Sequence, residues 1–282
     1  MSRPSSCTCC TSHKMTKSAH WLSQVASRRE GEVFFLIWTV LWISIVAAIV
    51  FFRWFEWFTS WHYLTVGLVI CVPCIFGPLI LPLSKSESTL DWSQRFSTKA
   101  NVWCFIMAFV SNYLWTHYFY RVLGASYTFT AHRLNDVPFC LYLITHSYFI
   151  TYHVGSSILL RRCGFKLPQW SSPLFWSIIL GMAYFTAFAE TYTIKNFPYY
   201  TFQDEQAMYR VGLGFYAIYF VVSYPMFLRL DQDGSRWTLS RTVIDSFACC
   251  MMITLLLDFW RLAIGPIFEM ELVKPAVVPF VF

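Results

Sequence analysis

The chain has 282 residues, of which 57% are hydrophobic and only 13% carry a charged side chain. Soluble domains usually contain about 25% charged residues, so this composition excludes an ordinary soluble protein and predicts an integral membrane protein. The net charge of +6 is explained by basic loops at one membrane face, and it gives no reason to expect a nucleic-acid partner.

Seven apolar stretches are long enough to cross a bilayer, which takes about 20 residues. In chain order they cover residues 33–52, 62–83, 100–120, 138–160, 173–194, 207–228 and 242–264. They predict an all-α, polytopic membrane helix bundle of about seven transmembrane helices. The connecting segments are too short to bury a core of their own, so residues 30–268 are expected to form a single membrane domain. A disordered, Cys-rich basic leader (1–29) and a short C-terminal tail (269–282) are expected to flank it.

The distribution of Lys and Arg predicts that the N-terminus lies in the cytosol. With seven spans, 14 of the 21 basic residues fall on the side of the N-terminus and 7 on the other side, as the positive-inside rule requires. The leader lacks the apolar core of a cleavable signal, so the first span is expected to act as an uncleaved anchor. Cys7, Cys9 and Cys10 are candidates for palmitoylation, with a plain disordered tail as the alternative.

Polar side chains inside the spans are the first candidates for chemistry, because a charge near the bilayer centre costs about 2.5 to 3.5 kcal/mol. In the third span, a spacing of four places Asn112 and Thr116 on one helical face and Tyr113 and His117 on another. Two polar ridges exceed what packing requires. They are candidates for binding a ligand, although His117 near the helix end could simply lie at headgroup level.

The fourth span contains His146 and His153, which are seven residues apart and therefore point the same way, about 10 Å from each other. That spacing is too wide for the helical zinc motifs. The chain also has no histidine box of the di-iron hydroxylases and no glycine-rich nucleotide loop. We therefore expect neither a metal nor a cofactor.

The last three spans add further ionisable or hydroxyl-bearing side chains. Glu190 lies near the end of the fifth span among apolar neighbours, where an unpaired carboxyl stays protonated and is a latent acid; the alternative is a hydrogen bond that joins helices. In the sixth span, Tyr216 and Tyr219 form either an edge for a ligand hydroxyl or a packing stripe. Asp258 and Arg261 are three residues apart, which favours an internal ion pair.

Aromatic residues make up 20% of the chain, more than two interfacial belts of Trp and Tyr would need. Phe side chains that face lipid can account for most of the excess. The alternative is a cavity that receives a large apolar ligand.

Three long strings are too specific to follow from hydrophobicity alone. They are NYLWTHYFYRVLGASYTF from Asn112, NFPYYTFQDEQAMYRVGLGFYAIYFVVSYPMF from Asn196 and LLDFWRLAIGP from Leu256. They resemble the cycloeucalenol cycloisomerase family, which comprises sterol-pathway enzymes of plants and algae, and the resemblance runs from about residue 31 to residue 266.

This resemblance implies opening of the 9β,19-cyclopropane ring of cycloeucalenol to give obtusifoliol, in the endoplasmic reticulum membrane and without a cofactor. The partners implied are the lipid bilayer and a cyclopropyl sterol, and protein partners stay open. The reaction requires a proton at carbon 19, cationic character at carbon 9 and loss of the carbon 8 proton. Because the ring and that hydrogen lie on one face of the sterol, one acid and its conjugate base can serve both steps.

The catalytic candidates are Glu190 as the first choice for this acid, His146 or His153 as an alternative donor or relay, and Asp258. The substrate-binding candidates are side chains that can hold the 3-hydroxyl or face the cation with an aromatic ring; they are Asn112, Tyr113, Trp115, His117, Tyr118, Tyr216 and Tyr219. Two other classes stay open at this point: a seven-span sterol receptor or transporter, and another cofactor-free sterol double-bond isomerase.

Overall fold

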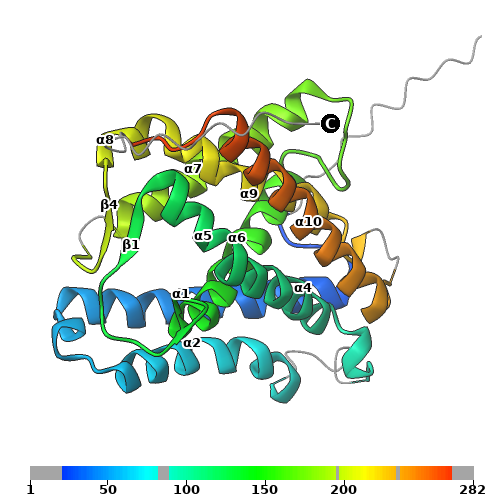
Figure 1. Ribbon diagram of the computed structural model, residues 1–282. Helices are drawn as coiled ribbons and strands as arrows, with labels where there is room; N and C mark the ends of the chain where they lie inside the picture. Colours follow the sequence, from blue (N-terminus) through cyan, green and yellow to red (C-terminus); the bar gives the residue numbers. More distant parts are fainter. Residues whose placement is uncertain (1–20, 82–88, 195–196, 233–235, 269–282) are drawn as a thin grey trace, which may run out of the picture.

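The computed structural model describes residues 21–81, 89–194, 197–232 and 236–268. Long helices dominate it (Figure 1). In chain order these are α1 (Ala26–Phe51), α2 (Ser60–Ile80), α4 (Phe96–Val110), α6 (Phe139–Arg162), α7 (Pro173–Ile194), α9 (Leu213–Leu228) and α10 (Leu239–Ala263). The closest packing is of α7 on α9, α2 on α6 and α10 on α4.

Within these described residues, five helical segments are long and apolar enough to cross a membrane. They are Ala26–Phe51, Ser60–Ile80, Pro173–Ile194, Glu205–Leu228 and Leu239–Ala263. The prediction of a helical, multi-pass membrane protein is thereby confirmed. The predicted spans at 100–120 and 138–160 are helical as well, but α4 and α6 carry more polar side chains and do not meet the same criterion of apolarity.

The first helix begins at Ala26, inside the segment predicted to be a disordered leader (1–29). The reason is a buried ion pair, because Arg28 and Glu32 are one helical turn apart and their Nε and Oε1 atoms lie 3.0 Å from each other. Arg161 at the end of α6 also contacts Glu32, at 2.6 Å. The start of α1 therefore belongs to the bundle. The Cys-rich part of the leader, with Cys7, Cys9 and Cys10, and the tail 269–282 lie outside the described residues.

Further charged side chains gather at this same end of the helices, one pair of them buried and one partly exposed. The Lys99 side chain at the start of α4 pairs with Asp231 just after α9, and Arg229 pairs with Asp245 in α10. Trp103 donates its indole N–H to the same Asp245, at 3.0 Å. Several cations counted as loop charges are thus fixed partners in an internal network that ties the helix ends together.

The third helical rod does not end with α4. It continues through a π-helical turn η3 (Ser111–Trp115), the short helix α5 (Thr116–Tyr118) and a second π-helical turn η4 (Phe119–Leu123). The helix that leads into α9 is built in the same way from α8 (Glu205–Ala207) and the π-helical η5 (Met208–Gly212). Such turns shift the faces that a helix presents and occur frequently at functional sites.

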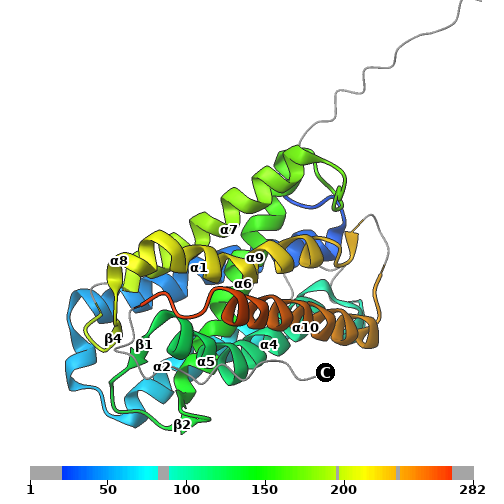
Figure 2. The same ribbon diagram turned by 45° about the horizontal axis from the view of Figure 1, so that its top comes forward.

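Short strands, which the all-α prediction did not include, lie at the end of the molecule opposite the buried charges (Figures 1 and 2). Strand β1 (Ala125–Tyr127) pairs antiparallel with β4 (Tyr200–Phe202), and β2 (Arg133–Leu134) pairs with β3 (Val137–Pro138) through a tight turn. In that turn Asn135 and Asp136 both have positive φ, as a two-residue hairpin turn of the primed type requires. Two further short helices in the described part of the chain are η1 (Trp54–Trp57) and η2 (Trp92–Gln94).

Candidate active site

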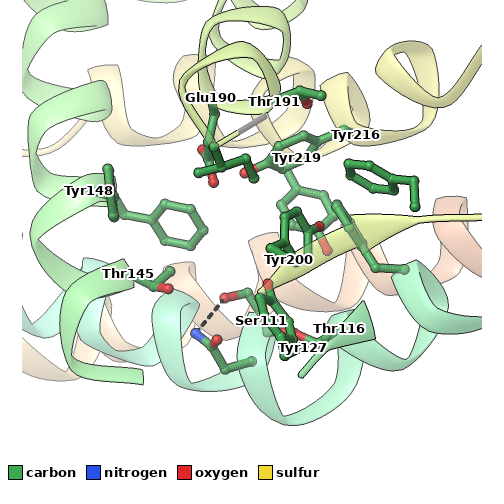
Figure 3. Close-up of a pocket in the computed structure, with 15 residues that line it drawn as sticks. Ser111, Thr116, Tyr127, Thr145, Tyr148, Glu190, Thr191, Tyr200, Tyr216 and Tyr219 are labelled. Atoms are coloured by element: carbon green, nitrogen blue, oxygen red, sulfur yellow. Dashed lines mark hydrogen bonds between the residues drawn. The ribbon is translucent and has the colours of Figure 1, made fainter. Parts of the chain in front are cut away.

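A cavity lies near this strand-bearing end, among the late part of the α4 rod, the first half of α6, the end of α7, the start of α9 and strands β1 and β4 (Figure 3). Eight of its fifteen lining residues are aromatic: Phe119, Tyr127, Tyr148, Phe149, Tyr200, Phe202, Tyr216 and Tyr219. The others are Ser111, Asn112, Thr116, Thr145, Glu190, Thr191 and Ile194. The cavity therefore combines aromatic walls with a few hydroxyl groups, one amide and one carboxyl.

Glu190 is the one acidic side chain among the described residues that line this cavity. It lies in the last turns of α7 and points into the space, with Tyr216 and Tyr219 beside it (Figure 3). The hydroxyls of Tyr152 and Tyr216 approach the carboxyl. Its Oε2 atom is nevertheless buried and has no hydrogen-bond partner within the described part of the chain. A carboxyl oxygen is thus available to a molecule that enters the cavity.

Two tyrosines on the paired strands cover one side of the cavity. The register of β1 and β4 places Tyr127 opposite Tyr200, and their rings stack with centroids 4.5 Å apart. Burial raises the pKa of Tyr127 well above its usual value and raises the pKa of Tyr200 in the same direction. Both phenols consequently stay neutral at physiological pH and add no negative charge beside Glu190.

A polar wall faces Glu190 across the cavity (Figure 3). Asn112 donates its amide to the Ala108 carbonyl at 2.9 Å and to Ser111 Oγ at 3.4 Å. These two bonds fix the orientation of the amide group, whose Oδ1 atom is a hydrogen-bond acceptor. A ligand hydroxyl can therefore donate to Oδ1 at a fixed place.

The structure brings together five of the residues singled out from the sequence. Glu190, Asn112, Tyr216 and Tyr219 all line the cavity, and so does Thr116, the predicted neighbour of Asn112 on its helical face. The second polar ridge of the same helical rod, formed by Tyr113 and His117, does not line the cavity. The Tyr113 ring is 39% exposed and stacks on Phe109.

The histidines of α6 lie apart from the cavity. His146 Nε2 lies 2.9 Å from Asn101 Oδ1 of α4, while His153 contacts Ser223 Oγ of α9 at 2.8 Å and the Phe149 carbonyl at 2.6 Å. Both side chains are fully buried. His146 thus contacts α4 and His153 contacts α9, so the geometry favours a helix-joining role over proton transfer to a ligand in the cavity.

The end of the third rod contacts the last helix. Tyr118 donates its hydroxyl to Asp258 at 3.1 Å, and Arg261 Nε donates to the same carboxylate at 2.8 Å, which confirms the ion pair expected from the sequence. Asp258 does not line the cavity, and its contacts with Tyr118 and Arg261 give it a structural explanation.

The two remaining substrate-binding candidates also lie outside the cavity lining. Trp115 donates its indole N–H to Thr254 at 2.8 Å, and its ring packs edge-on against Tyr219 at 4.6 Å. Trp115 therefore packs against a residue that lines the cavity, Tyr219, but does not line the cavity itself. The His117 ring contacts Tyr120.

Sequence reasoning missed several lining residues. Tyr148 and its helical neighbour Tyr152 are four residues apart, so the spacing rule applied to the other spans would have found them. Tyr127 and Tyr200 carried no such signal, because only the pairing of two distant strands brings them together. In the described residues no group of three or more His, Cys, Asp or Glu side chains is placed to hold a metal ion.

The sequence comparison decides the family. Over 253 residues the chain is 45% identical to a curated relative, cycloeucalenol cycloisomerase from Arabidopsis thaliana, and the alignment covers 88% of this chain and 90% of the relative. This chain belongs to the cycloeucalenol cycloisomerase family. It is therefore an isomerase of sterol biosynthesis, as the resemblance indicated.

Other comparisons add no template for the cycloisomerase fold. No family model matches the chain, and no solved structure is significantly similar to it.

Proposed function

We propose that this cycloisomerase opens the 9β,19-cyclopropane ring of cycloeucalenol and produces obtusifoliol. The proton that the acid donates forms the new carbon 19 methyl group while the bond between carbons 9 and 19 breaks. The cationic character at carbon 9 is then discharged when carbon 8 loses its proton and the ring double bond forms. One proton is added and one is lost, so the reaction is an isomerisation and balances without an oxidant or reductant.

Glu190 is the proposed acid, and its position is the single observation that carries the proposal. A strained carbon–carbon bond is a feeble base, so the donor has to be uncharged, shielded from water and well placed. Glu190 supplies the one carboxyl among eight aromatic rings, with Oε2 unpartnered in the described structure. The resulting Glu190 carboxylate can afterwards take the carbon 8 proton, since the cyclopropane ring and the carbon 8 hydrogen lie on the same face of the sterol.

The remaining cavity residues fit the other demands of the reaction. Tyrosine and phenylalanine faces can stabilise a nearby cation by about 2 kcal/mol when water is excluded. The Tyr216 hydroxyl beside the Glu190 carboxyl is placed to orient it. Across the cavity, Asn112 is the proposed acceptor for the sterol 3-hydroxyl. The histidines and Asp258 have no part in this scheme.

A sterol enters this cavity only if the cavity widens. The cavity has a volume of ≈ 80 Å³, whereas sites for ligands of this size usually measure about 300 to 1,000 Å³. Strands β1 and β4 pair over only three residues each and contribute Tyr127, Tyr200 and Phe202 to the lining. These strands are the proposed moving part.

We further propose seven spans with a cytosolic N-terminus, in the endoplasmic reticulum membrane. The lengths of the two less apolar predicted spans, which are α6 and the helical rod that begins with α4, support this count. Helix α6 has 24 residues, which corresponds to about 36 Å at 1.5 Å per residue and exceeds the roughly 30 Å of a bilayer core. The buried network around Glu32 would then lie at the cytosolic ends of the helices, and the cavity would lie toward the lumen.

Turnover by the purified protein tests the proposed function. The full chain, in nanodiscs without nucleotide or partner protein, is expected to convert cycloeucalenol to obtusifoliol, with the products separated by gas chromatography and mass spectrometry. Binding of the sterol without conversion would favour the receptor or transporter class. A product with a displaced ring double bond made from a sterol that has no cyclopropane would favour a different isomerase.

A further inference from the structure

A second, larger space lies away from the acid, in a groove between α2 and α4. Its walls come from Ile75, Phe76 and Leu79 of α2, from Trp92 of η2 and from Val102, Phe105 and Ile106 of α4. Its volume of ≈ 360 Å³ falls within the usual range for ligand sites. Its volume is therefore sufficient for a whole sterol. Its described lining residues include no ionisable side chain.

One buried polar atom in this groove has no partner within the described part of the chain. Thr98 lines the groove, its side chain is only 8% exposed, and its Oγ1 makes no hydrogen bond with any described residue. Thr98 is the third residue of α4, so no full helical turn precedes it to supply the carbonyl to which threonine hydroxyls farther along a helix can bond. The other buried polar side chain of the lining, Asn101, is already occupied by the Cys74 carbonyl and by His146.

We propose that this groove is a second binding site for sterols, in which the 3-hydroxyl bonds to Thr98 and the ring system lies along α2 and α4. A sterol has a single hydroxyl at one end of a rigid apolar body, and this groove offers a single unpaired hydroxyl in an apolar channel. A lipid acyl chain could fill the channel but would leave Thr98 unpaired, and a buried unpaired polar group is unfavourable.

The rim of the groove agrees with access from the bilayer. The aromatic rings of Trp92, Phe76 and Phe105 are 55%, 50% and 47% exposed, so the groove opens on the outer surface of the bundle rather than into its core. The site would hold sterol at the surface of the isomerase without taking part in the chemistry. It goes beyond the proposed function and does not depend on the role of Glu190.

Photolabelling tests this site. The full chain in sterol-free nanodiscs is irradiated with a diazirine-bearing sterol that has a free 3-hydroxyl, and labelled peptides are mapped by mass spectrometry. We expect labelling of the peptides that contain residues 75–79 and 98–106, and we expect an excess of unlabelled sterol to suppress it. The same labelling is expected in Glu190→Gln, because the groove is independent of catalysis.

Matched variants distinguish a specific sterol site from an apolar surface that binds any lipid. Thr98→Val keeps the shape of the side chain and is expected to reduce groove labelling about fivefold, the effect of one net hydrogen bond. Thr65→Val is the control, since the Thr65 hydroxyl bonds to its own helix at Trp61. Val102→Trp, which fills the groove, is expected to abolish labelling. Equal labelling of Thr98→Val, or equal labelling by the 3-methyl ether of the probe, would show that any lipid occupies the groove and would overturn the proposal.

Discussion

The replacement Glu190→Gln removes the acidic proton from the cavity and changes little else. Glutamine has nearly the same size, and its amide oxygen can still accept a hydrogen bond from the Tyr152 or Tyr216 hydroxyl that now approaches the carboxyl. The variant is therefore expected to fold and to bind sterol. In the proposed mechanism it loses both the donor for carbon 19 and the base for carbon 8.

The size of the loss follows from those two roles. A positioned general acid or base contributes about 10²- to 10⁴-fold to a rate. Since the proposed mechanism uses one carboxyl for both proton transfers, we expect a decrease at the upper end, about 10⁴-fold, which corresponds to about 5.4 kcal/mol in activation free energy. Turnover under saturating cycloeucalenol measures it, with sterol binding measured in parallel.

Glu56→Gln is the matched control, because it makes the same chemical change at an exposed ion pair with Arg53, outside the cavity lining. Its turnover should equal that of the unmodified enzyme. If Glu190→Gln retained turnover within about threefold, Glu190 would not be the acid. If it lost sterol binding and thermal stability together with turnover, Glu190 would be a structural residue.

Three other substitutions follow from the same structure. Glu32→Gln leaves Arg28 and Arg161 buried without their carboxylate, so the free energy of unfolding, measured with denaturant, should fall by about 3 to 5 kcal/mol. Glu56→Gln, at an exposed ion pair, should lower it by less than about 1 kcal/mol, and equal losses in the two variants would refute the importance of the buried network. Tyr216→Phe removes a hydroxyl beside Glu190 and should slow turnover roughly tenfold, the effect of one hydrogen bond to a polar group, with an unchanged melting temperature. Asp258→Asn should keep turnover within about twofold, as expected for a partly exposed ion pair, and a severe loss in a kinetic assay would restore Asp258 as a catalytic candidate.

The helical part of the fold could be read from the sequence because its signal is local. Each span is a continuous apolar run, and the helices found in the structure overlap all seven predicted stretches. The start of α1 was misplaced for a physical reason. Arg28 looks like a loop charge in the sequence, but its partner Glu32 lies one turn away and Arg161 more than a hundred residues away, so its burial is a tertiary effect.

The candidate site was only partly predictable. Glu190 stood out because an isolated carboxyl in an apolar span is costly, and Asn112 stood out by its helical spacing. Tyr127 and Tyr200 could not be foreseen, since the strands that hold them are three residues long and pair across 75 positions, as the Ser126–Thr201 contact shows. For the histidines, helical spacing predicts a common direction but not which helices their side chains will contact.

Solvent deuterium in a single turnover tests the central claim most directly. The isomerase is equilibrated in heavy water and then given less cycloeucalenol than enzyme, so that each product molecule receives its proton from an acid that has exchanged with solvent. The account predicts obtusifoliol with one deuterium in the carbon 19 methyl group, and no such product from Glu190→Gln. Obtusifoliol without deuterium at carbon 19, or unchanged cycloeucalenol with a folded and inserted protein, would contradict it.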